Sequence, residues 1–391
     1  MKKVVIVFFS LIASGLCFGS SISNLYIVRS DRTLVQIYKF YQADVGNHLL
    51  NETYPVNPKS IVSYVINQDT TTKKRVAYLW PTSAVLSGVV ALIENTNEKR
   101  YKTILDTDVL PGLEHYYDIS RQPACYQSYL NSDGKQDRYY DDNVWLDIDF
   151  ASLFLETKEK KYLSKAEEIW KFVISGWDDK LGGGIYWCEQ KKSSKNTCSN
   201  APAAVAAAKL YEATKNKEYL QWSKKIYAWT KLNLQDKSDL LYYDNINLNG
   251  LIGKQKFAYN SGQMLQAAVL LYNITKEKEY LTDARSIASA GYNFFFETHL
   301  GANGKSIKLV KQGNIWFTAI MLRGYIELYL VDKNKTYLNA FKYSLDLAWK
   351  NSRDKNGLFE DDWTGKEKNS SKWLLAQGAM VEMYARLSAI K

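Results

Sequence analysis

The amino-acid sequence predicts an all-α protein in which six inner helices are surrounded by six outer helices, an (α/α)6 barrel. Two observations lead to this prediction. A phrase recurs with a period of roughly 50 to 60 residues, which indicates a repeated structural unit. Helices rich in small residues also alternate with amphipathic helices along the whole chain.

The recurring phrase is clearest in residues 210–220, LYEATKNKEYL, and in residues 271–281, LYNITKEKEYL. Looser copies occupy residues 154–163 and 328–338. In each copy an apolar, small-residue helix precedes a short polar turn, and an amphipathic helix follows it. This pattern is typical of a repeated helical hairpin.

The two sets of helices follow from apolar residues spaced at i, i+3, i+4 and i+7. The inner set is rich in Ala, Gly and Ser, which lets a helix pack closely on more than one side. It is predicted at residues 82–96, 142–156, 201–214, 260–275, 314–331 and 373–388. The outer set is amphipathic and carries lysines on one face, as a solvent-facing ring should. It is predicted at residues 30–42, 98–116, 160–176, 217–234, 278–298 and 335–351.

The chain is expected to form one catalytic domain over residues 22–391, because its 46% hydrophobic content supports one large core and no Pro/Gly/Ser-rich linker divides it. Residues 1–21 are predicted to be a secretory signal peptide. Two lysines are followed there by an apolar stretch and then by small residues. We therefore expect a secreted or periplasmic protein.

The cysteines leave two questions open. Cys17 follows the apolar stretch where a lipoprotein would carry its acylated residue, but Leu16 before it disfavours lipid anchoring. Cys188 and Cys198 are close enough in sequence to form a disulfide in an oxidising compartment. The alternative is that the cysteines remain unpaired and buried.

Composition argues against several classes of function. The formal charge is +10, but the basic residues are scattered along the chain, so nucleic-acid binding is disfavoured. The three histidines are widely spaced, which argues against a histidine-based metal site, and no cofactor is expected. No segment after the signal reaches the length of a membrane-spanning helix. We expect a monomer.

The candidate functional residues lie just before or at the start of inner helices. Asp141 and Asp142, residues 182–187, residues 199–202, residues 259–262 and Trp316 all have such positions. They should converge on one end of the barrel, where loops on a rigid scaffold commonly carry function.

Asp141 and Asp142 are the predicted catalytic pair. Retaining cleavage of a glycosidic bond requires a carboxylate nucleophile and a carboxylic acid about 5 to 5.5 Å apart, and adjacent residues at a helix start can present both to one cleft. The helix N-terminus favours one charged group, and that charge raises the proton affinity of the other. The alternative is that the pair only caps the helix. A second pair, Asp361 and Asp362, shows that adjacency alone is weak support.

Aromatic residues supply a second indication, since 14% of the chain is Phe, Trp or Tyr. Flat rings suit the faces of sugars. Four tryptophans near inner-helix starts could either stack on a sugar or pack in the core: Trp80, Trp145, Trp187 and Trp316.

Five motifs together resemble the successive signatures of glycoside hydrolase family 76. In chain order they are YDDNVW (140–145), GGIYW (183–187), NAPA (200–203), YNSG (259–262) and WFTAIMLRG (316–324). The resemblance extends from about Trp80 to the last helix. It implies an (α/α)6 fold, endo-acting cleavage of α-1,6-mannan, Asp141 as nucleophile and Asp142 as acid/base. The further residues expected to bind substrate are Asn200, Asp244, Tyr259 and Asn260, in addition to the four tryptophans.

The sequence thus predicts a retaining endo-α-1,6-mannanase that acts by double displacement. Two alternatives remain open. One is another (α/α)6 sugar enzyme, such as an unsaturated glucuronyl hydrolase. The other is a non-catalytic protein that binds mannan through the same aromatic mouth.

Overall fold

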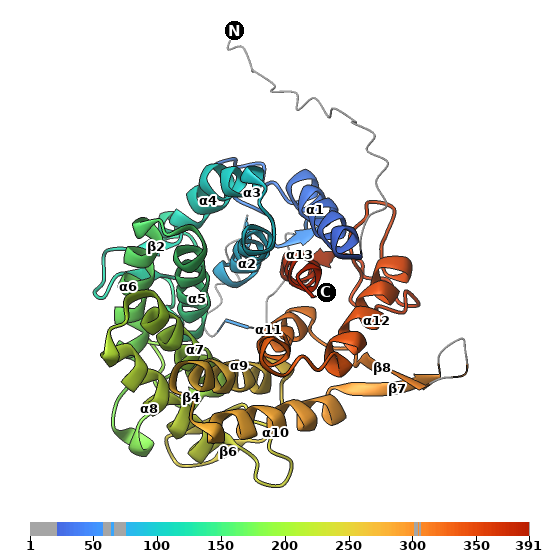
Figure 1. Ribbon diagram of the computed structural model, residues 1–391. Helices are drawn as coiled ribbons and strands as arrows, with labels where there is room; N and C mark the ends of the chain where they lie inside the picture. The colour runs from blue at the N-terminus through green and yellow to red at the C-terminus, as the bar shows by residue number, and fades with distance from the viewer. Residues whose placement is uncertain (1–21, 58–63, 66–75, 301–303, 305, 391) are drawn as a thin grey trace.

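The computed structural model describes residues 22–57, 64–65, 76–300, 304 and 306–390. Figure 1 shows two concentric rings of helices around a common axis, which confirms the predicted (α/α)6 barrel. The predicted signal peptide, including Cys17, lies outside the described residues. Within the described ranges, no helix is long and apolar enough to cross a membrane.

The inner ring is built from alternate helices of the chain. Its members are α2 (Leu79–Asn95), α5 (Tyr140–Thr157), α7 (Thr197–Thr214), α9 (Ala258–Thr275), α11 (Ile315–Asp332) and α13 (Leu374–Ser388). Each packs against the next, and α13 closes the ring by packing against α2. Most side chains of these helices are buried, as the small-residue pattern predicts.

The outer ring covers the inner one. It consists of α1 (Ile22–Phe40), α6 (Lys160–Ser175), α8 (Lys217–Leu234), α10 (Lys278–Phe294), α12 (Thr336–Asn351) and one interrupted helix. The interrupted helix is formed by α3 (Lys99–Ile104), a π-helical segment (Leu105–Val109) and α4 (Leu110–Glu114). Three predicted ends were wrong by four residues or more: α1 begins at Ile22 rather than residue 30, and α7 begins at Thr197 rather than residue 201. Helix α10 stops at Phe294 rather than residue 298, because the chain there enters a strand.

The recurring phrase forms the turn of each helical hairpin. Helices α5, α7, α9 and α11 end at a lysine in the left-handed conformation, with φ near +60°, and its backbone N–H bonds to the carbonyl four residues earlier. These lysines are Lys158, Lys215, Lys276 and Lys333. A left-handed residue ends the helix and satisfies one of its last carbonyls. The next outer helix therefore begins within three residues, antiparallel to the inner one.

Close packing of the inner ring depends on glycines. A Cβ on Gly324 of α11 would collide with the carbonyl oxygen of Gly262 on α9, and one on Gly378 of α13 would lie 2.7 Å from the carbonyl carbon of Ala84 on α2. Because real side chains do not approach this closely, these positions require glycine.

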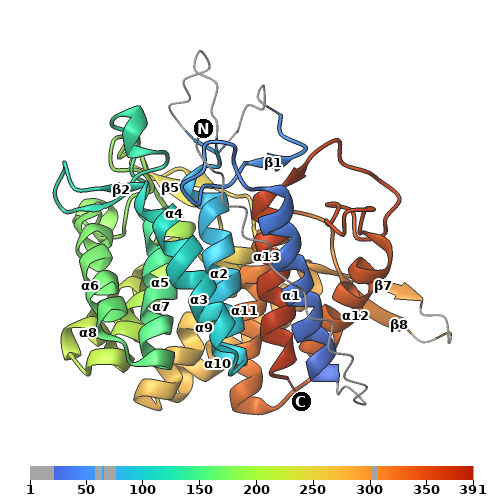
Figure 2. The same ribbon diagram turned by 90° about the horizontal axis from the view of Figure 1, so that it is seen from above.

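Short strands lie at one end of the barrel, together with two 3₁₀ turns at Asn131–Asp133 and Lys180–Gly182. The antiparallel pairs are β1 (Thr53–Tyr54) with β9 (Lys372–Trp373), and β2 (Tyr117–Asp118) with β3 (Cys125–Tyr126). The strands β4 (Ser194–Asn196), β5 (Asn245–Asn247) and β6 (Ile252–Gly253) form a three-stranded sheet. In the side view β1, β2 and β5 lie at the end opposite the C-terminus (Figure 2). A longer hairpin of β7 (Phe296–Leu300) and β8 (Ser306–Val310) projects from the outer ring.

A buried ionic layer crosses the barrel interior. Arg323 of α11 donates to Glu382 of α13 at 2.6 Å, and Arg386 bonds both Glu382 at 2.6 Å and Glu94 of α2 at 2.8 Å. Arg323 and Glu382 both lie eight residues after the first residue of their helices, which corresponds to about 12 Å along the helix axis. The contact between Arg323 and Glu382 therefore lies beneath the end of the barrel where the inner helices begin, and Arg386 and Glu94 extend the layer toward the other end.

Candidate active site

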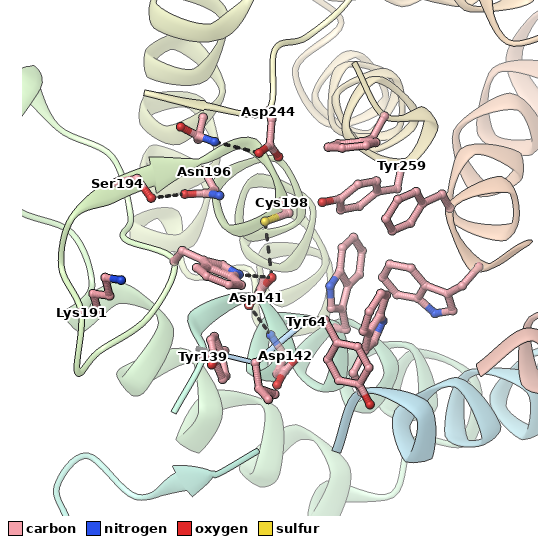
Figure 3. Close-up of a pocket in the computed structure, with 18 of the residues that line it drawn as sticks. Tyr64, Tyr139, Asp141, Asp142, Lys191, Ser194, Asn196, Cys198, Asp244 and Tyr259 are labelled. Carbon is pink, nitrogen blue, oxygen red and sulfur yellow. Dashed lines mark hydrogen bonds between the residues drawn. The ribbon is translucent and has the colours of Figure 1, made fainter. Parts of the chain in front are cut away.

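A pocket of about 400 Å³ opens at the end of the barrel where the inner helices begin (Figure 3). We refer to it as the main pocket. Eight residues predicted to act in catalysis or binding line it: Trp80, Asp141, Asp142, Trp145, Trp187, Asp244, Tyr259 and Trp316. Asp141, Asn200 and Tyr259 all belong to the first turn of an inner helix, so the predicted convergence at one end is confirmed.

Asp141 lies in the first turn of α5 and is held by three donors. Its Oδ2 accepts hydrogen bonds from the indole Nε1–H of Trp187 at 2.8 Å and from the thiol of Cys198 at 3.3 Å. Its Oδ1 accepts the backbone N–H of Asp142 at 3.0 Å. Burial raises the pKa of Asp141 to about 6, and these three hydrogen bonds oppose a larger rise. The helix N-terminus also favours its negative charge.

Asp142 faces the same pocket in a different electrostatic environment. Burial and the neighbouring charge of Asp141 raise its pKa well above the ordinary value for an aspartate. Because Asp141 has the hydrogen-bond donors and Asp142 has the adjacent negative charge, the first proton leaves Asp141 and the second stays on Asp142. Two carboxyl groups whose environments separate their proton affinities form an acid and a base side by side.

Aromatic rings form one wall of the main pocket. The rings of Trp80 and Trp145 each contact Trp316 edge to face, with centroids 5.3 Å and 5.0 Å from that of Trp316. Tyr259 and Phe317 stack with their centroids 4.1 Å apart. These rings pack against one another and line the pocket at once, so core packing and sugar stacking are not exclusive at these positions.

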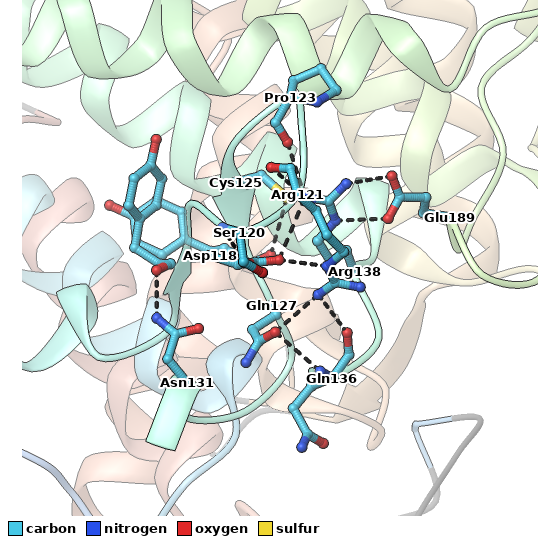
Figure 4. A network of polar contacts seen from close by, with 12 residues as sticks. Asp118, Ser120, Arg121, Pro123, Cys125, Gln127, Asn131, Gln136, Arg138 and Glu189 are labelled. Carbon is cyan, nitrogen blue, oxygen red and sulfur yellow. Dashed lines mark hydrogen bonds and ion pairs between the residues drawn. The ribbon is translucent and has the colours of Figure 1, made fainter. Parts of the chain in front are cut away.

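A short backbone pairing brings Trp187 to Asp141. The N–H of Tyr140 donates to the carbonyl of Trp187 at 2.9 Å, and the N–H of Glu189 donates to the carbonyl of Arg138 at 3.0 Å. The buried guanidinium of Arg138 forms a bidentate ion pair with Glu189, in which Nε lies 2.7 Å from Oε2 (Figure 4). Such a planar pair fixes relative orientation as well as distance. It holds the start of α5 in register with the loop that carries Trp187.

The same network extends away from the main pocket. Asp118 accepts from Arg121 Nε at 2.6 Å and lies 3.6 Å from Arg138 Nη1, while Arg121 also donates to Gln127 at 2.9 Å (Figure 4). These contacts tie the segment between α4 and α5 to the base of the site. The polar groups of this network form hydrogen bonds with one another, which indicates that the network supports the structure of the site.

Asp244 lies opposite Asp141 in the main pocket (Figure 3). Burial raises its pKa, and the hydrogen bond from the amide of Asn245, at 2.7 Å, opposes this rise. A third carboxyl group therefore shares the pocket with the aspartate pair. It is placed to accept hydrogen bonds from hydroxyl groups of a ligand.

Two predicted substrate-binding residues do not line the main pocket. Asn200 is fully buried; its amide donates to the carbonyls of Ile185 and Asn196, and its oxygen accepts the N–H of Ile185. It therefore holds the glycine-rich loop before Trp187 and has no free group for a sugar, so its predicted role is corrected to loop support. Asn260 is also buried, and it directly follows Tyr259 in the first turn of α9.

Sequence reasoning missed several residues of the main pocket. These are Tyr64, Val65, Tyr139, Lys191, Ser193, Ser194, Asn196, Cys198, Asn245, Phe257 and Phe317. Tyr139 and Cys198 are direct neighbours of predicted motifs, so extending those motifs by one residue would have included them. Phe317 lies inside the motif of residues 316–324 but was not singled out. Tyr64 had no such signal, because it reaches the pocket from a segment far away in the sequence.

The cysteines are unpaired in the structure. Cys125, Cys188 and Cys198 are all free and buried, so the disulfide between Cys188 and Cys198 is absent and the alternative of buried thiols is confirmed. Cys198 instead donates to Asp141. Among the described residues, no three His, Cys, Asp or Glu side chains cluster as metal ligands would.

Comparisons with known proteins identify the family of this chain. The family model described as glycosyl hydrolase family 76 matches residues 45–390. A solved family 76 mannosidase from Bacteroides thetaiotaomicron is 33% identical, with 94% of this chain and 98% of that chain covered and a TM-score of 0.85. The solved α-1,6-mannanase from Salegentibacter sp. is 25% identical, with 94% and 100% covered and a TM-score of 0.74.

Similarity to curated relatives is more limited in extent. The mannan endo-1,6-alpha-mannosidase DCW1 of Saccharomyces cerevisiae is 29% identical over 149 residues, which are 36% of this chain. The match spans 33% of that relative, about a third of its length.

Proposed function

Because the chain belongs to glycosyl hydrolase family 76, we propose that it is an endo-α-1,6-mannanase that acts with retention of configuration. The observation that carries this proposal is the pair Asp141 and Asp142. The two carboxyl groups share one aromatic-lined pocket, and their environments favour ionisation of the first and protonation of the second. These are the two states that a retaining glycosidase needs before reaction.

The proposed reaction has two displacements. In the first, the carboxylate of Asp141 forms a bond to the anomeric carbon while the glycosidic bond breaks, and Asp142 gives its proton to the departing oxygen. In the second, the Asp142 carboxylate takes a proton from water, the water oxygen bonds to the anomeric carbon, and Asp141 is released. Two inversions restore the α configuration.

Other residues of the main pocket support binding of a sugar. The stacked rings of Tyr259 and Phe317 and the indole of Trp80 present flat apolar surfaces, which suit the faces of sugar rings.

The alternative function, a mannan-binding protein without catalysis, would explain the aromatic wall of the main pocket but not the aspartate pair. A binding site gains nothing from a carboxyl group whose proton is retained only because a second carboxylate lies beside it. Burying both groups costs free energy, and such perturbed groups concentrate at catalytic sites.

Hydrolysis of unbranched α-1,6-mannan tests the proposal. We expect short oligosaccharides as products, and proton NMR during early hydrolysis should show the α-anomer first. Asp141→Asn should abolish turnover, whereas Asp361→Asn, which changes an aspartate of the other adjacent pair outside the main pocket, should leave it unchanged. Initial appearance of the β-anomer would refute the double displacement. Full activity of Asp141→Asn would refute the site.

We further propose that the protein is exported, so that it meets a polysaccharide outside the cytoplasm. The basic and apolar pattern of residues 1–21 supports this. Mass spectrometry of the protein from fractionated cells should find a mature N-terminus near residue 22 outside the cytoplasmic fraction. An intact N-terminus in the cytoplasm would contradict export.

A further inference from the structure

Cys198 contacts the carboxylate of Asp141 directly. It lies in the first turn of α7, is 3% exposed, and lines the main pocket. Its Sγ is 3.3 Å from Asp141 Oδ2, the same oxygen that accepts the indole N–H of Trp187 at 2.8 Å. Two side chains from different elements thus converge on one oxygen of the aspartate (Figure 3). The other oxygen accepts the backbone N–H of Asp142.

The thiol of Cys198 remains protonated in this environment. Burial and the negative charges of Asp141 and Asp244 raise its pKa well above the ordinary value for a cysteine. A protonated thiol is a hydrogen-bond donor and a poor nucleophile. Cys198 is therefore suited to donate to Asp141, and it is not suited to attack a substrate itself.

We propose that Cys198 is a positioning residue for Asp141, forming with Trp187 a two-donor clamp that fixes the orientation and the proton affinity of this carboxylate. The proposal rests on the proposed role of Asp141 as nucleophile. The clamp stops rotation of the carboxylate about its Cβ–Cγ bond, because rotation would break both side-chain hydrogen bonds. A held carboxylate does not have to be reoriented for attack.

A thiol has a specific advantage at this position. An S–H group is a weak donor, so it orients the oxygen while withdrawing little of the negative charge that attack requires. A hydroxyl would hold the charge more strongly and would lower the pKa of Asp141 further. The weak donor therefore complements the stronger indole N–H of Trp187, which provides most of the stabilisation.

Several other ionisable groups surround Asp141 and would contribute to any pH dependence. They are Asp142 on the same helix, Asp244 from the segment before β5, Tyr259 on α9 and Lys191 from the loop before β4. Substitution of Cys198 removes none of these groups, and Tyr259, which also bonds the thiol, keeps its proton because burial raises its pKa well above the ordinary value. A change in the titration of Asp141 in a Cys198 variant is then assigned to the lost donor.

The pH dependence of kcat/KM tests the clamp with two substitutions that act in opposite directions. Cys198→Ala removes a donor to the ionised form, so the acid limb should move to higher pH by about half a unit, because a thiol is a weak donor. Cys198→Ser restores a donor and should return the limb to the wild-type pH or below it. Cys125→Ser, which replaces another buried thiol that neither lines the main pocket nor bonds Asp141, should leave the limb in place. A space-filling role for Cys198 predicts no movement in any variant, and that result would overturn the proposal.

A second measurement requires no substrate and separates this proposal from the proposed function. The infrared difference spectrum between the wild-type protein and Cys198→Ser isolates the S–H stretching band of Cys198. The band should shift as Asp141 titrates, and Asp141→Asn should abolish the shift. A shift in a protein that does not cleave mannan would support the contact and refute the function. A band that does not respond to pH would refute the clamp, whatever the activity.

Discussion

Trp187→Phe isolates the stronger of the two donors to Asp141. The substitution keeps an aromatic ring beside Tyr139, whose centroid lies 5.0 Å from that of Trp187. It removes the Nε1–H that donates to Asp141 Oδ2 at 2.8 Å. Because this hydrogen bond stabilises the ionised carboxylate, its loss raises the pKa of Asp141.

The size of the effect follows from the kind of hydrogen bond. A bond to a charged group contributes about 1.5–3 kcal/mol, and one pKa unit corresponds to about 1.36 kcal/mol. The full loss would raise the pKa by about one to two units, and the remaining donors favour the lower end of this range. Since the pKa of Asp141 starts at about 6, the variant should need a pH near 7 to ionise it.

The pH dependence of kcat/KM on a linear α-1,6-mannooligosaccharide measures this shift. Activity that needs ionised Asp141 is lost as the pH falls through the pKa, so the acid limb of Trp187→Phe should lie about one unit higher than that of the wild type. One unit below the wild-type limb, the variant should be slower by about tenfold, and the difference should narrow at higher pH.

Trp222→Phe is the matched control, because Trp222 packs against Trp177 from α8, away from the main pocket. Its acid limb should coincide with that of the wild type. A Trp187→Phe variant that is slower by the same factor at every pH would refute the reasoning. The indole would then act through packing alone.

Two further predictions concern catalysis and packing. Asp142→Asn should cost about 10²- to 10⁴-fold in kcat on mannan and much less on an aryl mannoside with a good leaving group, since general acid help is needed only for poor leaving groups; equal losses on both substrates would contradict its role as the acid. Gly324→Ala forces a methyl group against the carbonyl of Gly262 and should lower the free energy of unfolding in urea by about 1–3 kcal/mol. Unchanged stability would mean that α9 and α11 separate without strain.

Much of the fold is predictable from local pattern. The expected helix 217–234 matches α8, and the expected helix 142–156 lies inside α5. Both agree because helical periodicity is a property of neighbouring residues. The hairpin of β7 and β8 was not predicted, because each strand depends on a partner across a turn and its residues show no strict alternation.

The two aspartate pairs show where local pattern stops being informative. Asp362 accepts hydrogen bonds from backbone N–H groups of its own loop. Burial raises its pKa, but the hydrogen bonds from Glu367 and Thr364 help to lower it to about 2. Asp141 and Asp142 have raised pKa values in a buried pocket. Adjacent aspartates look alike in the sequence, and what distinguishes them is the surroundings that folding supplies.

Local sequence was therefore sufficient for the helices, their order and the position of Asp141 and Asp142 at a helix start. The tertiary structure alone assigned Asn200 to the support of a loop and Cys198 to the carboxylate of Asp141. The two side-chain donors to Asp141 come from 46 and 57 residues away along the chain. Hydrogen bonding and proton affinity depend on such distant neighbours, because they are set by contacts and burial that exist only after the ring of helices has closed.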